Sequence, residues 1–134
     1  MEINSANARD FQVIESYGPG GFRVSGQRFS GAILVLPRRT IAWPVAGLSA
    51  VDAACLGEIA AEQPEIEVFL LGCGDRAGLL TAAQRRDLRD SLGLSVDVMD
   101  TGAACRTYSV LLAEGRPVAA GLFPVTEMGI NRHR

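Results

Sequence analysis

The alternation of helices and strands from residue 52 to residue 123 constrains the fold of this chain most. Apolar residues at helical spacing predict helices over residues 52–62, 81–93 and 101–113. Short apolar runs predict buried strands over 67–71, 94–99 and 117–123. Strands that are joined through helices run parallel, with right-handed crossovers. This part of the chain therefore predicts a largely parallel central sheet with helices packed against it.

Capping residues support these helix boundaries. Asp52, Thr81 and Thr101 each precede a helical pattern and are predicted N-caps, because their side-chain oxygens can accept hydrogen bonds from free backbone amides. Gly93 closes the middle helix as a C-terminal glycine does.

The N-terminal third has a different pattern, of strands and turns. Strands are predicted within 11–16, 22–29, 32–37 and 40–45, and the glycine-rich segment at 17–21 breaks the first two. Pro44 indicates an edge or an end of the last of these strands, since proline cannot donate to a ladder. The segment must therefore add a β hairpin or a second small layer to the sheet. We predict one α/β domain over 11–124, with polar tails at 1–10 and 125–134.

Charge and cysteine content exclude several classes of protein. The formal net charge is −2 and the arginines are scattered, so we expect no nucleic-acid partner. The number of cysteines is odd, at 3, and none belongs to a CxxC motif, which favours reduced thiols and neither a disulfide framework nor a metal site. The first ten residues lack an apolar segment, and no apolar run is long enough to span a bilayer. We therefore expect a cytoplasmic protein without cofactor or metal.

Two segments follow the carboxyl ends of predicted sheet strands, where open α/β sheets form their ligand crevice. The first, LGCGD, resembles a phosphate loop only weakly, because it lacks both GxGxxG and GK[ST]. The second is DTGAACR. The sequence therefore predicts one groove or binding site, formed by Gly72, Cys73, Gly74, Asp75, Asp100, Thr101, Cys105 and Arg106.

Two catalytic interpretations of DTGAACR are weaker than the interpretation that this segment only joins a strand to a helix. An aspartic protease needs two such loops sharing a proton, followed by a flap, whereas a helix and one strand follow Gly102 here. Cys105 lies early in a helix beside Arg106, which favours a thiolate. Catalysis by cysteine usually needs a neighbouring base, however, and the chain's one histidine, His133, lies in the C-terminal tail. We predict that Cys105 packs as a small apolar residue and is not a nucleophile.

Arg106 is predicted to be the polar residue of this segment that the protein can least lose. Positive charge is disfavoured near a helix N-terminus, so we expect the guanidinium to bridge Asp100 and Asp75. The alternative is that Arg106 extends into solvent and contributes nothing.

A second candidate surface is the glycine-rich loop, which can form a binding surface or be a plain turn. It comprises Tyr17, Gly18, Pro19, Gly20 and Gly21. Trp43 belongs either to the core or to an interface.

Four segments together resemble one known family. They are SYGPGGFRVSG at 16–26, GAILVLP at 31–37, EVFLLGCGD at 67–75 and MDTGAACRTYSVLLAEGRPVAAGLFP at 99–124. They are similar to the small domains that include mitochondrial respiratory complex I assembly factor 3 and bacterial relatives. This resemblance covers about 11–124 and implies a three-layer α/β domain with a central mixed sheet and an added hairpin.

The resemblance implies no enzyme activity. It implies an interaction or assembly protein that binds a protein partner and is linked to respiratory complex biogenesis. The alternative is a small-molecule binder or enzyme that uses the groove between LGCGD and DTGAACR. Because the start of the chain is not a serine- and arginine-rich transit peptide, we expect a bacterial cytoplasmic member.

Overall fold

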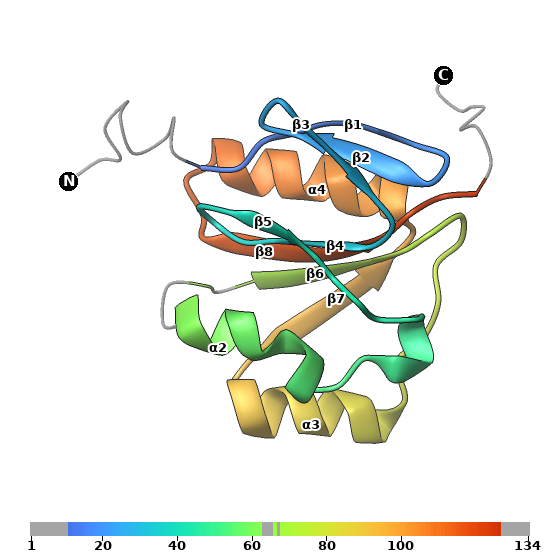
Figure 1. Ribbon diagram of the computed structural model, residues 1–134. Coiled ribbons are helices and arrows are strands. Elements are labelled where there is room, and N and C mark those ends of the chain that lie inside the picture. The colour runs from blue at the N-terminus through green and yellow to red at the C-terminus, as the bar shows by residue number, and fades with distance from the viewer. Residues whose placement is uncertain (1–10, 63–65, 67, 127–134) are drawn as a thin grey trace.

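A computed structural model describes residues 11–62, 66 and 68–126 and has three layers. A five-stranded mixed sheet forms the centre, in the order β5-β4-β8-β6-β7. Helices α2 (Gly57–Glu62) and α3 (Ala82–Leu92) lie on one side of this sheet, and α4 (Thr101–Ala113) and a smaller three-stranded sheet lie on the other (Figure 1). The predicted fold class, a three-layer α/β domain with an added N-terminal β layer, is confirmed. The predicted tail at 1–10, and residues 127–134 of the tail predicted at 125–134, lie outside the described residues.

The central sheet combines parallel and antiparallel strands. β6 (Val68–Cys73), β7 (Ser95–Met99) and β8 (Val118–Phe123) are parallel, with β6 between the other two. β4 (Ile33–Val35) pairs antiparallel with β8, and β5 (Thr40–Ala42) pairs antiparallel with β4 at the edge. All of β8 is buried, as expected for a central strand covered on both faces.

The smaller sheet consists of β1 (Ile14–Gly18), β2 (Gly21–Val24) and β3 (Gln27–Ser30), all antiparallel. Its last two strands correspond to the single run predicted at 22–29. That run is divided by a two-residue turn in which Ser25 and Gly26 have φ angles of 46° and 85°. Left-handed backbone at both central residues suits a tight hairpin whose twist matches that of its strands.

Two apolar cores fill the spaces between the layers. The core on the α3 side contains Trp43, whose indole NH donates to the Cys55 carbonyl at 2.9 Å and whose ring stacks on Phe123 at 5.3 Å. Trp43 is thus a core residue. The core on the α4 side is closed by Tyr108, which is fully buried and donates its hydroxyl to the Gln12 carbonyl at 2.6 Å.

The helix ends largely follow the predicted caps. Thr81 forms a capping box with Gln84, and Gly93 closes α3 with a φ of 68°. The helix predicted over 52–62 is instead a 3₁₀ turn at Ala54–Leu56 followed by α2. The N-cap of this turn is Ala53 and not the predicted Asp52, although the Asp52 carboxylate accepts from the Cys55 amide at 2.9 Å.

Candidate functional site

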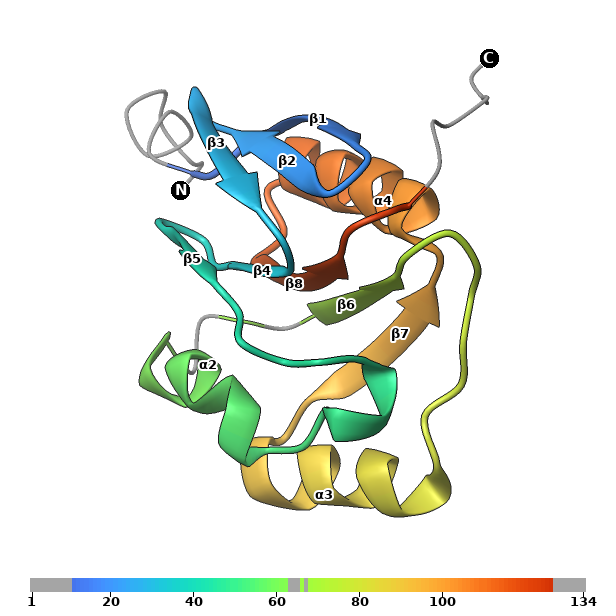
Figure 2. The same cartoon turned by 45° about the vertical axis from the view of Figure 1, so that its right-hand side comes forward.

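The two segments predicted to form a groove meet at the carboxyl edge of the parallel strands. Gly72 and Cys73 end β6, and Gly74 and Asp75 follow them. The chain passes directly from β7 into α4 (Figure 2), and Asp100 is the residue between them. The two segments were predicted to lie close together because the strands before them were predicted to be parallel. β6 and β7 do pair in parallel.

Thr101 connects these two segments directly. Its hydroxyl donates to the Phe123 carbonyl at 2.6 Å and accepts from the Gly74 amide at 2.8 Å, and its own amide donates to the Gly74 carbonyl at 2.9 Å. Thr101 is fully buried. A buried hydroxyl with both partners supplied is stabilising, whereas an unpartnered one would be costly. The segments are therefore bonded to each other at this point.

Asp100, and not Thr101, is the N-cap of α4. Its carboxylate accepts from the Ala103 amide at 2.8 Å, while Thr101 is already helical. Both residue types are good N-caps, so local sequence does not distinguish them. The distinction comes from Gly74 and Phe123, which are distant in sequence and occupy the Thr101 hydroxyl.

The two cysteines of the predicted groove lie on opposite faces of the sheet. Cys105 is buried in the core on the α4 side, whereas Cys73 packs against the core on the α3 side. Burial raises the pKa of the Cys105 thiol to about 12, and the neighbouring Arg106 guanidinium opposes this only in part. His133 lies outside the described residues. A protonated buried thiol is a poor nucleophile, which supports the predicted packing role.

The raised pKa of Cys105 predicts alkaline loss of stability. Below pH 9, its unperturbed value, the thiol is protonated in both states. Above it the unfolded chain loses the proton and the native chain keeps it, so the free energy of unfolding falls by about 1.4 kcal/mol per pH unit until the native pKa is reached. Urea midpoints between pH 8 and pH 10.5 measure this slope. Cys105→Ala should make it shallower, and parallel curves for both proteins would contradict the assignment.

Arg106 does not form the predicted bridge to Asp100 or Asp75. Its side chain is exposed on α4. In the described part of the chain no ion pair joins Arg106 to either carboxylate. Asp100 caps α4, and Asp75 accepts from the Thr126 amide at 3.0 Å and 3.2 Å and from its hydroxyl. Backbone amides therefore occupy both carboxylates.

Arg106→Lys should therefore change the free energy of unfolding by less than about 0.5 kcal/mol, as for other exposed substitutions. Urea midpoints of the two proteins measure the difference. A loss above about 1 kcal/mol would restore Arg106 as a structural anchor.

The glycine-rich loop lies beside the same edge of the sheet. A Cβ atom on Gly102 would come 2.6 Å from the Tyr17 hydroxyl, so Tyr17 packs closely on the first turn of α4. Pro19 pairs with Val125, and the Gly20 amide donates to the Val125 carbonyl at 3.0 Å. The described fold thus continues past residue 124, the predicted end of the domain. No local sequence pattern predicts these contacts, because they join segments that are far apart in the chain.

The loop also lines an open concavity of about 550 Å³ on the smaller sheet. All five predicted loop residues contribute to it, together with Ser16, Phe22, Arg23, Arg28, Phe29 and Ser30.

The described residues contain no group of three or more histidine, cysteine or acidic side chains that could hold a metal ion. In the same part of the chain, no helix has the length and apolar character required to cross a membrane.

Known proteins resemble this chain over nearly all of the described fold. NADH dehydrogenase [ubiquinone] 1 alpha subcomplex assembly factor 3 of Danio rerio is 38% identical over 124 residues, which cover 92% of this chain and 71% of the relative. An uncharacterized protein of Rhodobacter capsulatus is 34% identical, with 84% of each chain covered. The solution structure of a Bordetella pertussis protein, described as a Mth938-like domain, matches with a TM-score of 0.72 and 31% identity and covers 100% of this chain and 99% of its own.

A family model matches residues 14–123, from the first strand of the smaller sheet to the last strand of the central one. The matched range contains both candidate surfaces, apart from the Pro19 partner Val125. The chain belongs to the family of proteins of unknown function DUF498/DUF598.

Proposed function

We propose that this protein is a non-catalytic assembly factor that binds a protein partner during the biogenesis of a respiratory NADH dehydrogenase. The similarity to NADH dehydrogenase assembly factor 3 over 92% of the chain carries this proposal. The relative's name describes its role in assembly.

The partner surface that we propose is the glycine-rich loop, Tyr17 to Gly21. Pro19 and Gly20 are exposed, and Tyr17 is 37% exposed although its hydroxyl packs on Gly102. Exposed loops held on a rigid scaffold are common binding surfaces. Here the scaffold is the paired strands β1 and β2, together with the bridge to Val125.

The groove between residues 72–75 and 100–106 is the less favoured alternative. A small-molecule site needs an open pocket with converging polar groups. The hydroxyl and amide of Thr101 and the carboxylate of Asp100 are instead hydrogen-bonded within the protein.

We also propose a cytoplasmic location, in keeping with three unpaired cysteines.

Deletion of the coding gene from the source cell tests the proposed function. We expect less fully assembled NADH dehydrogenase on native gels and lower membrane NADH:quinone activity, with both restored by the wild-type chain. A second respiratory enzyme, such as succinate dehydrogenase, serves as the control and should not change. Normal amounts of assembled NADH dehydrogenase in the deletion strain would overturn the proposal.

A further inference from the structure

The outer face of the smaller sheet carries two arginines directly opposite each other. Arg23 of β2 pairs in register with Arg28 of β3, and both side chains are exposed. Like charges that face each other across strands destabilise a sheet. This pair therefore needs a compensating negative charge, from within the protein or from a partner.

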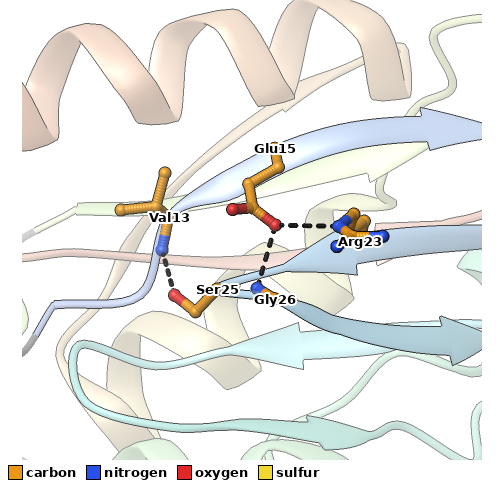
Figure 3. Close-up of polar contacts among 5 residues, drawn as sticks. All are labelled: Val13, Glu15, Arg23, Ser25 and Gly26. Carbon is orange, nitrogen blue, oxygen red and sulfur yellow. Dashed lines mark hydrogen bonds and ion pairs between the residues drawn. The ribbon is translucent and has the colours of Figure 1, made fainter.

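Glu15 compensates only one of the two arginines. Its Oε1 atom lies 3.3 Å from Arg23 Nε and also accepts from the Gly26 amide at 2.9 Å (Figure 3). Arg28 has no ion pair within residues 11–62, 66 and 68–126. One guanidinium on this face is thus without a counter-charge from the described residues, although the chain as a whole is acidic, with a net charge of −2.

A row of two glycines and a serine, with little side-chain cover, lies next to the arginine pair. Gly18, Gly21 and Ser30 are in register across the three strands, two residues along from Ser16, Arg23 and Arg28. Residues two apart in a strand point to the same face, so the strip and the arginines share the outer face. The concavity of about 550 Å³ is lined by both rows.

Gly18 is not required by the fold at this position. A Cβ atom there would meet nothing within 4 Å, and its φ is outside the left-handed region. Gly21 differs, because its Cβ would come 2.5 Å from the Phe29 carbonyl oxygen. A glycine within a strand costs conformational entropy and often marks a place where another backbone approaches closely. Close approach of a partner backbone to this face would explain why residue 18 is a glycine.

We propose that the outer face of the β1–β2–β3 sheet binds an acidic segment of a partner protein. Partner carboxylates lie against Arg28 and the terminal nitrogens of Arg23, and the partner backbone lies over Gly18. Arginine binds carboxylates through paired, charge-assisted hydrogen bonds. This inference rests on the proposed function, because it names the chemistry of the partner that the assembly factor would bind.

A peptide titration tests the surface. The probe is a fluorescein-labelled peptide of twelve residues in which glutamate alternates with serine, and its glutamine counterpart is the control. We expect saturable binding of the glutamate peptide, at least tenfold tighter than that of the glutamine peptide, with backbone amide NMR shifts concentrated in residues 16–30. Equal binding of both peptides, or shifts elsewhere, would overturn the proposal. Tighter binding of a twelve-nucleotide single-stranded DNA would also overturn it in favour of a nucleic-acid site.

Two variants with matched controls localise the binding. Arg28→Gln should weaken binding of the glutamate peptide at least fivefold, whereas Arg86→Gln, at an exposed position on α3, should not. Gly18→Ala should also weaken binding at least fivefold with an unchanged or higher melting temperature. Gly47→Ala is its control, because a Cβ there also meets nothing within 4 Å. If Arg28→Gln and Gly18→Ala both bound the glutamate peptide as tightly as wild type, this face would not be the binding site.

The same variants distinguish failure of this surface from failure of the proposed function. If gene deletion impairs NADH dehydrogenase assembly but Gly18→Ala and Arg28→Gln restore it like wild type, the function holds and this surface is wrong. If deletion has no effect while the peptide binds at Arg28, the surface holds and the assembly role is wrong.

Discussion

Thr101→Val should lower the free energy of unfolding by about 3 kcal/mol, because it leaves two buried backbone groups without partners. Valine has nearly the shape of threonine, so packing is retained. The lost hydroxyl donates to the Phe123 carbonyl and accepts from the Gly74 amide, and both hydrogen bonds are buried. Urea denaturation of the two proteins, followed by circular dichroism, measures the difference.

Two further variants make this result specific to the hydroxyl. Thr101→Ser keeps the hydroxyl and should therefore keep most of the stability that Thr101→Val loses. Thr107→Val removes a half-buried hydroxyl that donates only a weak hydrogen bond, to Met99 Sδ at 3.7 Å, and should cost less than about 1 kcal/mol. A loss below about 1 kcal/mol in Thr101→Val would show that the two segments do not depend on Thr101 for their connection.

Gly121→Ala should lower the free energy of unfolding by about 2 kcal/mol through overpacking. Its Cβ atom would lie 2.6 Å from Trp43 Cζ3 and 3.1 Å from Phe69 Cζ. Neither ring can move aside easily, since Trp43 is 3% exposed and Phe69 is fully buried. Thermal and urea unfolding measure the loss, and near-ultraviolet circular dichroism should report a changed environment of Trp43.

Gly57→Ala is the matched control for Gly121→Ala. A Cβ atom at this helical position would meet nothing within 4 Å, so the same substitution should raise stability by up to about 1 kcal/mol. If both variants lost stability equally, the effect at Gly121 would not be one of steric overlap.

The proximity of the candidate segments could be predicted from sequence, but their contacts could not. Residues 72–75 and 100–106 both follow parallel strands, and this rule correctly placed them at one edge of the sheet. Two predicted contacts were wrong: Thr101 is not the N-cap of α4, and Arg106 does not bind Asp100 or Asp75. The groups that occupy Thr101 and Asp75 instead belong to Gly74, Phe123 and Thr126, which no local pattern connects to them. Tyr17 against Gly102 is a contact of the same kind.

The sequence by itself determined the elements whose signals are local. The Thr81 capping box, Gly93 and the apolar spacing define α3, and apolar runs define β6, β7 and β8. The four segments that carry the resemblance also identified the family from sequence. Only the tertiary structure decided that β8 inserts between β4 and β6, that Ser25 and Gly26 divide one predicted strand into two, and that Gly121 must lack a side chain. Periodicity reports which face of a segment is buried, whereas strand order, close approach and hydrogen-bond partners depend on residues distant in sequence.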